Sequence, residues 1–270
     1  MRKRVLIAVK TYPSLSDKYN ELVCTAGFLD DGSWIRLYPV QFRMLNQSLQ
    51  YPKYSFIELD VAKNTSDHRV ESYRPINISS SLKIVGKLGT EDDWAARREI
   101  VLRNVDNNLS ELIDRSKRDR ISLAVYKPTQ VLDFVWEPAD REWDKKKLEK
   151  VKSNLMQLSL FEEHQEANRF FKVVRKLPYK FSYRFTDIDG STHTLMIEDW
   201  ELGALYWKCV DNGDSEQQAC QKVRQMYFDT MCKKDLYFYL GTTLAHPNTF
   251  IIIGTFYPPF PKPRVLSLFD

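Results

Sequence analysis

A group of acidic side chains near residue 190 could hold a divalent metal ion. Asp187 and Asp189 lie in one turn, and Glu198 follows the next predicted strand. Metal-dependent nucleases hold Mg²⁺ or Mn²⁺ with two or three carboxylates near a strand end. His193 lies between these acids and could act as a base, because the unperturbed pKa of histidine is close to neutral pH. The alternative is structural, because Asp-x-Asp-Gly is a turn signature and acids at a helix start cap the helix.

A predicted strand in the N-terminal region carries aromatic and cationic side chains that could bind nucleic acid. Trp34, Arg36 and Tyr38 share one face of this strand, and Arg43 follows shortly after it. Such a face could bind a base or single-stranded DNA, because bases stack on aromatic rings while cations contact phosphates. The alternative is that Trp34 and Tyr38 pack inward and that Arg36 reaches out from the rim.

A second strand, residues 179–185, alternates in a similar way. It places four aromatic residues on one face and Lys180, Ser182 and Arg184 on the other. In one interpretation the aromatic rings stack on bases. In the other, which the alternation favours, they form the core and the basic face is exposed to solvent. Lys180 and Arg184 could contact a nucleic-acid backbone in either case.

Two short segments share the pattern Leu-Ser-Leu-Phe. They consist of Gln157, Leu158, Ser159, Leu160 and Phe161, and of Leu266, Ser267, Leu268 and Phe269. Both resemble the peptide with which bacterial proteins bind the replicative sliding clamp. In that peptide a leucine and a terminal aromatic residue enter an apolar pocket while the glutamine amide bonds its rim. The resemblance implies a sliding clamp as partner and work on DNA near replication or repair, and it leaves the activity open.

Both segments could instead belong to a core, because short apolar motifs recur by accident. The internal copy has charged flanks, at residues 144–152 and 162–166. The terminal copy follows the proline-rich run 258–263, where an extended tail is expected. The internal copy matches the pattern better, since Val265 stands where the terminal copy would need glutamine.

The composition is that of a globular protein. The chain has 270 residues, of which 43% are hydrophobic and 28% charged, so it is long enough for one large domain or two modest ones. Aromatic residues make up 13%, which indicates large cores together with binding surfaces. The net charge of +4 is compatible with a polyanionic partner such as nucleic acid.

Several classes of protein are not indicated. The sequence has no run of about 18 or more apolar residues, and its first apolar run is too short for a signal peptide, so we expect a cytoplasmic protein without a membrane partner. The four cysteines lack C-x-x-C spacing and the histidines are scattered, which argues for reduced thiols and against zinc. Phosphate-binding loops and G-x-S-x-G are absent, and no cofactor is expected beyond Mg²⁺ or Mn²⁺ for a nuclease.

The sequence predicts an α+β fold that begins with a β-rich, barrel-like domain at residues 1–140. Short strands separated by turns are typical of small barrels. We expect such strands at residues 4–9, 21–28, 34–38, 54–62 and 83–85. An amphipathic helix follows over residues 91–116, and two further strands at 121–126 and 130–136.

A charged helix and linker at residues 141–168 should connect this domain to a second one. The second domain, residues 169–258, is predicted to be a ββααββ unit. Its strands are expected at 179–186, 192–197, 236–240 and 249–256, and its helices at 199–210 and 215–233. Residues 250–253 are continuously apolar, which predicts a strand buried on both faces. Residues 259–270 form a proline-rich tail with the second Leu-Ser-Leu-Phe segment.

Three functions remain open at this stage. The first is a DNA-associated protein of repair or defence that is recruited by the sliding clamp and binds nucleic acid. The second is a nuclease that uses Mg²⁺ or Mn²⁺ at the acidic group. The third is an interaction module with no nucleic-acid role, in which both Leu-Ser-Leu-Phe segments are core. A nuclease would require a divalent metal, whereas a nucleic-acid binder would lose affinity steeply with salt.

Overall fold

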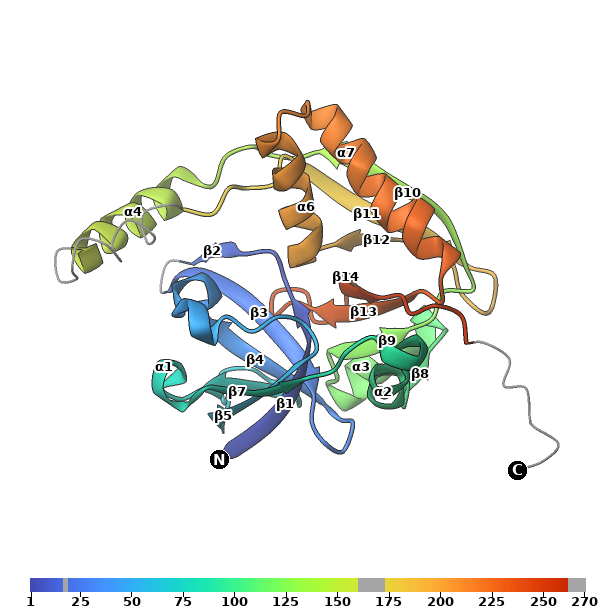
Figure 1. Cartoon of the computed structure of the whole chain (residues 1–270), viewed down its shortest axis with the longest axis horizontal. Coiled ribbons are helices and arrows are strands. Elements are labelled where there is room, and N and C mark those ends of the chain that lie inside the picture. The colour runs from blue at the N-terminus through green and yellow to red at the C-terminus, as the bar shows by residue number, and fades with distance from the viewer. Residues whose placement is uncertain (17–18, 160–172, 262–270) are drawn as a thin grey trace.

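The described residues of the computed structural model, 1–16, 19–159 and 173–261, form two seven-stranded sheets with helices around them (Figure 1). Within residues 155–159 the description is limited to the backbone. The strands of the first sheet are β1 (Arg2–Lys10), β2 (Ser14–Ser16), β3 (Asn20–Phe28), β4 (Trp34–Val40), β5 (Ser55–Lys63), β6 (Ser72–Pro75) and β7 (Lys83–Lys87). Those of the second are β8 (Val105–Asp106), β9 (Leu123–Tyr126), β10 (Gln130–Pro138), β11 (Tyr179–Thr186), β12 (Thr192–Ile197), β13 (Tyr237–Thr242) and β14 (Phe250–Phe256).

The α-helices of the described residues are distributed over both halves of the chain. They are α1 (Ile78–Ser81), α2 (Glu91–Val101), α3 (Leu109–Asp119), α4 (Lys145–Ser159), α6 (Trp200–Asp211) and α7 (Glu216–Arg224), which continues into a π-helical segment, Gln225–Thr230. Among the residues described, no helix combines the length and the apolar character that crossing a bilayer requires.

Five strands of the first sheet close into a barrel, which confirms the barrel-like prediction. Their order is β1, β3, β4, β6 and β5, and the ring closes because β1 also pairs with β5. Neighbouring strands are antiparallel except for β4 and β6, which are parallel. β2 and β7 extend the sheet by pairing with β3 and β5.

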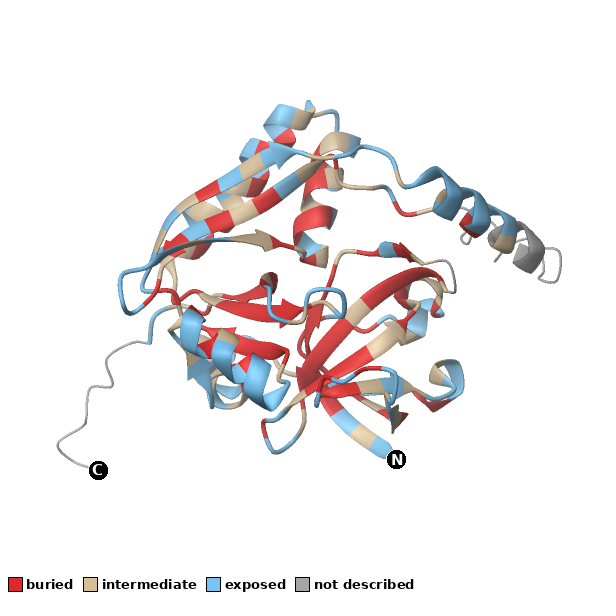
Figure 2. Ribbon diagram, turned by 180° about the vertical axis from the view of Figure 1, so that it is seen from behind, coloured by how far each residue is buried: buried red, intermediate tan, exposed pale blue. Residues whose placement is uncertain are grey.

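The first strand is buried on both of its faces. Val5 and Ile7 point into the barrel, where they join the buried residues Ile35 and Leu37. Leu6 and Ala8 point outward into a second apolar cluster, which the barrel shares with the other sheet. This double burial explains the unbroken apolar run near the N-terminus, and Figure 2 shows the barrel strands as largely buried.

The second sheet lies between the barrel on one side and α6, α7 and the π-helical segment on the other. Its strand order is β10, β11, β12, β14, β13, β9 and β8. Phe238 and Leu240 face α6, α7 and the π-helical segment, whereas Tyr239 between them packs with the residues of the barrel. The run at 250–253 divides in the same way, with Ile252 on the helix side and Ile253 on the barrel side. The prediction of a strand buried on both faces is therefore confirmed for β14.

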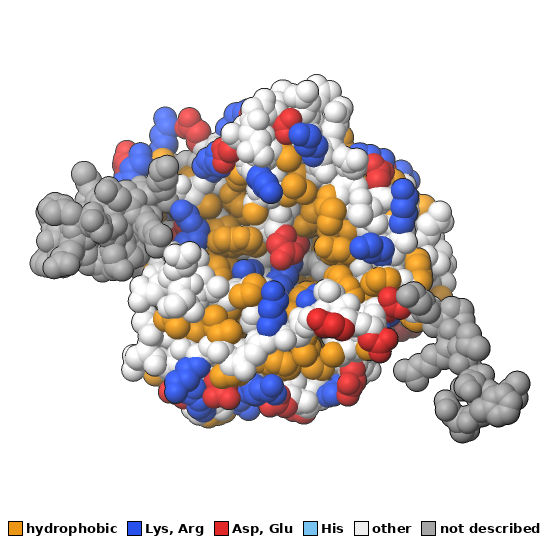
Figure 3. All heavy atoms as spheres, viewed as in Figure 1, with side chains coloured by type: hydrophobic (Ala, Val, Ile, Leu, Met, Phe, Trp, Pro, Cys, Tyr) orange, Lys and Arg blue, Asp and Glu red, His pale blue; other side chains and the backbone are white. Residues whose placement is uncertain are grey.

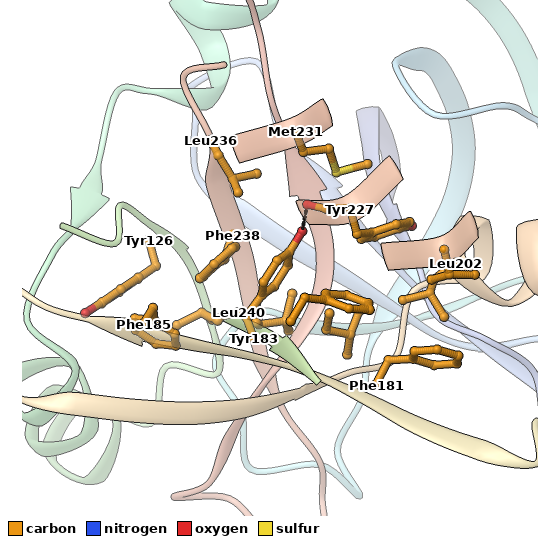
Figure 4. Close-up of a cluster of buried hydrophobic side chains, with 14 of the residues drawn as sticks. Tyr126, Phe181, Tyr183, Phe185, Leu202, Tyr227, Met231, Leu236, Phe238 and Leu240 are labelled. Atoms are coloured by element: carbon orange, nitrogen blue, oxygen red, sulfur yellow. Dashed lines mark hydrogen bonds between the residues drawn. The ribbon is translucent and has the colours of Figure 1, made fainter. Parts of the chain in front are cut away.

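The helix-side core is rich in aromatic residues, as Figure 4 shows. Phe181, Tyr183 and Phe185 of β11 are all buried there, so this aromatic face is core rather than a base-stacking surface. The Tyr183 hydroxyl donates a hydrogen bond to the backbone carbonyl of Tyr227, which lies in the π-helical segment.

Two predicted boundaries in the middle of the chain need correction. We expected the first domain to reach residue 140 and residues 141–168 to connect two domains. Strands β8, β9 and β10 belong instead to the second sheet, and β10 pairs with β11 along its whole length. The helix α4 is therefore an excursion between two neighbouring strands of one sheet, and it extends sideways from the body of the molecule (Figure 1).

The predicted helix at 91–116 is two helices separated by a short strand. α2 ends at Val101, and β8 then pairs in parallel with β9. The Asn108 side chain accepts a hydrogen bond from the Glu111 amide at 3.1 Å and starts α3. Val101 of α2 packs into the cluster that the barrel shares with the second sheet, whereas Leu109 and Leu112 of α3 pack on the helix side of that sheet. Apolar residues on both sides of the break kept the helical spacing, so the sequence period did not reveal it.

A buried ion pair joins the barrel to α6. Lys53, just before β5, donates from Nζ to Asp199 Oδ1 at 2.9 Å and to Glu201 Oε2 at 2.7 Å. The Tyr227 hydroxyl donates to the other Asp199 oxygen at 3.1 Å. Asp199 also caps α6 and forms a β-bridge with Thr11 at the end of β1. Burial opposes protonation of Lys53, but the two carboxylates outweigh it and raise the pKa of the lysine above its ordinary value.

We expect Lys53→Met to lower the free energy of unfolding by about 3–5 kcal/mol, because it leaves the buried Asp199 carboxylate without its cation. Lys53→Met/Asp199→Asn should recover much of this loss. The matched control is Lys222→Met, since Lys222 pairs with Asp214 on the surface and should matter little. Urea denaturation of the three variants tests this, and equal midpoints for Lys53→Met and Lys222→Met would contradict it.

Candidate functional site

A cleft of about 520 Å³ lies between the outer face of β3 and β4 and the second sheet. Sites for small ligands are typically clefts of roughly 300–1,000 Å³ with apolar walls and a few polar groups. The walls of this cleft are mostly apolar and include aromatic side chains from Tyr12, Tyr38 and Trp143. Its size and lining therefore fit a ligand of the dimensions of a nucleobase or nucleotide.

The three residues predicted to share one face of β4 all point toward the second sheet. Trp34 packs against Phe28, with ring centres 4.1 Å apart, and edge-on against Tyr239 at 5.8 Å. It therefore belongs to the contact between barrel and sheet. Arg36 and Tyr38 follow Trp34 on the same face at intervals of two residues, and both line the cleft.

Arg36 is a buried cation on the barrel wall of the cleft, only 3% exposed. Its Nη2 donates to the Ser122 carbonyl at 3.1 Å and hydroxyl at 3.0 Å, and its Nη1 donates to the Cys24 sulfur at 2.9 Å. No carboxylate of the described part of the chain forms an ion pair with it, and its Nε has no hydrogen-bond partner there. The alternative in which Arg36 reaches out from the rim is therefore wrong. Arg36 is buried in the barrel wall and places a positive charge next to the cleft.

Arg69 lies on the same wall and is neutralised. Its guanidinium forms a two-pronged pair with Asp67, with Nη2 2.6 Å from Oδ2, and donates from Nη1 to the Thr242 carbonyl at 2.8 Å. Burial opposes ionisation of Asp67, but hydrogen bonds from Arg69 and Ser72 outweigh it and hold the pKa of Asp67 at about 2. This pair fixes the barrel wall against β13.

Glu198 lies on the opposite wall, directly after β12. Its backbone is held from both sides: its amide donates to the Ile252 carbonyl at 2.8 Å, and its carbonyl accepts from the Tyr12 amide at 3.4 Å. Burial raises the pKa of its carboxyl group.

Tyr12 stands between this cleft and a second cavity of about 710 Å³. Its hydroxyl donates to the Arg175 carbonyl at 2.6 Å and accepts from Trp207 Nε1 at 2.9 Å. Its ring lies against Gly203 of α6, where a Cβ atom would come within 2.2 Å of the ring. Only glycine at this position lets the tyrosine ring reach its place.

The second cavity contains another predicted site residue, Arg43. It is lined also by Trp200 and Trp207 of α6 and by Arg175, whose guanidinium lies 4.0 Å from the centre of the Trp207 ring. Arg43 Nη1 lies 2.5 Å from Glu21 Oε2. The two cavities share Tyr12, so aromatic and cationic side chains continue from one into the other.

Lys180 and Arg184 of β11 are placed differently from each other. Lys180 lines the cleft and lies 3.7 Å from Glu137 in a solvent-exposed pair. Arg184 is exposed further along β11, opposite Asp133 of β10, and does not line either cavity. Of the basic residues predicted for this strand, Lys180 therefore reaches the cleft and Arg184 does not.

The predicted metal site is not assembled. Asp187 is buried and lies 2.9 Å from His193 Nε2, and Asp189 bonds the amide of Ser191 in the turn. Glu198 lies at the other end of β12, and six residues at a rise of about 3.3 Å separate the two ends by roughly 20 Å. Over the described ranges, no group of three or more His, Cys, Asp or Glu side chains could hold a metal ion. The turn interpretation of the Asp-x-Asp-Gly segment accounts for these contacts.

The clamp-like segments fall largely outside the described residues. The last turn of α4 contains Gln157, Leu158 and Ser159, of which the structure describes the backbone. Outside the described residues lie Leu160, Phe161, Leu266, Leu268 and Phe269.

Several cleft residues carried no signal that could have identified them. Arg69 and Thr242 are 173 positions apart in the chain and meet only in the folded protein. Tyr179 and Met196 come from neighbouring strands, and Lys176 precedes β11 in a segment without periodicity. For Tyr12 the one local hint is its position directly after the buried first strand.

Two family models match the chain. One, a domain of unknown function (DUF8758), covers residues 1–103, and the other, a domain of unknown function (DUF8757), covers residues 105–270. Their junction coincides with the point where the chain leaves the first sheet and enters β8. No curated protein matches the chain.

We expect Gly203→Ala to displace Tyr12 and to destabilise the protein by about 1–3 kcal/mol, as overpacking of a tight contact does. The indole of Trp207 would lose its hydrogen bond to Tyr12, so the tryptophan emission should change as well. The matched control is Gly86→Ala in β7, where the nearest atom to a new Cβ is 3.9 Å away. Equal melting temperatures and spectra for both variants would contradict this account of Tyr12.

Proposed function

We propose that this chain, which belongs to the DUF8757 family, is a DNA-associated protein that holds an unpaired nucleotide of single-stranded DNA in the cleft between its barrel and its second sheet. The observation that carries the proposal is the placement of Tyr38 and Arg36 on one wall of the cleft and of Trp143 beside Lys176 on another, with Lys176 Nζ 5.7 Å from the Trp143 ring centre. Aromatic rings beside cations are the usual equipment for binding unstacked bases together with their phosphates.

The dimensions and charge of the site favour a single strand over a duplex. A cleft of about 520 Å³ can take a base and sugar but no double helix. Figure 3 shows acidic and basic side chains interspersed over the surface that it displays, without a large patch of one sign. A duplex bound through its phosphates would call for such a patch. The proposed contact is therefore local, with Lys176 and Lys180 at the cleft as the cations nearest to a strand entering it.

The barrel offers a supporting analogy. Small five-stranded barrels of the OB type bind oligonucleotides on the face of their second and third strands. β3 and β4 are the second and third of the five strands that close this barrel, and the cleft lies on their outer face. Because folds are shared by unrelated functions, the side chains of the cleft weigh more than the analogy.

Recruitment by a bacterial sliding clamp is the second part of the proposal. It rests on the Gln-Leu-Ser-Leu-Phe sequence that starts at Gln157 and on the near-copy that ends at Phe269. The first of these begins at the outer end of α4, the helix that extends from the body of the molecule (Figure 1).

Tyr38→Ala should weaken the binding of a labelled single-stranded oligonucleotide by about 1–3 kcal/mol, the usual contribution of one stacked base. Fluorescence anisotropy in a salt series measures this, and the wild-type affinity should fall as salt rises. Arg184→Ala is the matched control, because Arg184 is exposed on β11 outside both cavities. Equal losses for the two variants, or duplex binding as strong as single-strand binding, would contradict the placement in the cleft.

Isothermal calorimetry with a bacterial sliding clamp should show binding that is lost in Leu160→Ala/Phe161→Ala, in a deletion of residues 264–270, or in both combined. Melting temperatures should be unchanged, because a docking peptide contributes little to the fold. A wild-type chain that does not bind the clamp would refute recruitment. So would variants that unfold, since a buried phenylalanine costs about 3–5 kcal/mol when it is truncated to alanine.

A further inference from the structure

Glu198 is a carboxylate left without a partner inside the cleft. It is partly buried, and the backbone bonds to Ile252 and Tyr12 fix its position between the sheet and the barrel. Its side chain forms neither a hydrogen bond nor an ion pair with any residue that the structure describes. Burial without a partner disfavours the charged form, in keeping with the raised pKa of the group. A ligand that donates hydrogen bonds would remove this cost.

Apart from Arg36, the other charged residues around the cleft have partners of opposite charge. Arg69 is paired with Asp67, Lys176 lies 3.9 Å from Asp140, and Lys180 lies 3.7 Å from Glu137. The pair of Arg69 holds a wall of the cleft, whereas the pairs of Lys176 and Lys180 are exposed and leave both lysines available to phosphates.

Two further polar atoms of the cleft, besides the carboxylate of Glu198, have no hydrogen-bond partner in the described part of the chain. Among the described residues, Arg36 Nε and Thr242 Oγ1 are buried polar atoms of the same cleft without hydrogen bonds. Buried polar groups are usually satisfied, so two unsatisfied buried atoms close to the unpartnered carboxylate of Glu198 point to a ligand with a polar edge. Glu198 supplies acceptors only, and Arg36 supplies donors only, so this edge should itself carry both donors and acceptors.

We infer that Glu198 selects guanine as the base held in the cleft. This inference rests on the proposed function. On its Watson–Crick edge guanine presents two neighbouring N–H donors, from N1 and from the 2-amino group, which match the two oxygens of a carboxylate. Thymine presents one N–H between two carbonyl oxygens, which a carboxylate would repel. Adenine and cytosine each place an acceptor nitrogen beside the amino group. The acceptors O6 and N7 of guanine are the atoms that arginine and lysine contact most often.

The test is a set of single-stranded oligonucleotides that differ in one central base: guanine, adenine, cytosine, thymine or hypoxanthine. The guanine strand should bind about tenfold more tightly than the thymine strand, since a good bidentate pair discriminates against the wrong base by about an order of magnitude or more. Hypoxanthine keeps the N1 donor but lacks the 2-amino group, so it should fall between them.

Glu198→Gln should abolish this preference, because it weakens binding of the guanine strand and removes the repulsion of thymine. Asp140→Asn is the matched control, because Asp140 also lines the cleft but its side chain is 96% exposed. It should leave the preference for guanine intact. Comparison of the bases on the wild-type chain decides the question even if Glu198→Gln does not fold.

The outcomes distinguish the selection of guanine by Glu198 from the proposed binding of single-stranded DNA. Equal binding of all five strands by the wild-type chain would overturn the selection of guanine and leave the binding of single-stranded DNA standing. A preference that persists in Glu198→Gln would overturn the role of Glu198. A third arm uses free GMP: if GMP binds in a Glu198-dependent way and no strand binds, guanine recognition stands and the proposed function falls.

Discussion

The buried ion pair between Lys53 and Asp199 is the contact on which the arrangement of the two sheets depends. It lies where the barrel meets the first turn of α6, and Tyr227 of the π-helical segment completes it. A buried pair of this kind adds little net stability, but either charge alone would cost several kcal/mol, so separating the two parts at this point is expensive. With this corner fixed, β9, β13 and β14 lie directly on the barrel, and the outer face of β3 and β4 borders the cleft.

Local patterns predicted the fold where strands alternate between core and surface. Residues 179–186 and 192–197 were predicted at the bounds that β11 and β12 have, because alternation and an Asp-Gly turn are both encoded in neighbouring residues. The assignment of strands to sheets was not accessible in this way. β8 has two residues, and β10 follows α3 in sequence yet pairs across the α4 excursion with β11. Such pairings depend on contacts between distant parts of the chain.

In the candidate site, too, local patterns predicted some residues and contacts between distant parts of the chain decided the others. Arg36 and Tyr38 were placed on one face by the two-residue period of a strand, and both line the cleft. The same reasoning could not find the wall that they face, because Glu198 reaches it through the end of β12 and a bond to Tyr12. Glu198 had been grouped with acids close to it in sequence, but an extended strand carries its two ends apart. Nearness in sequence is thus a poor guide to a shared site when a strand intervenes.

The most direct test of the cleft as the binding site is photocrosslinking of the full chain to a single-stranded oligonucleotide that carries 5-iodouracil next to a guanine, followed by mass spectrometry of the adducts. The expected result is crosslinking at Tyr12, Tyr38 or Trp143, whose rings line the cleft. Adducts confined to the exposed face of β10 and β11 around Arg184, or the absence of any adduct with a bound oligonucleotide, would contradict the account.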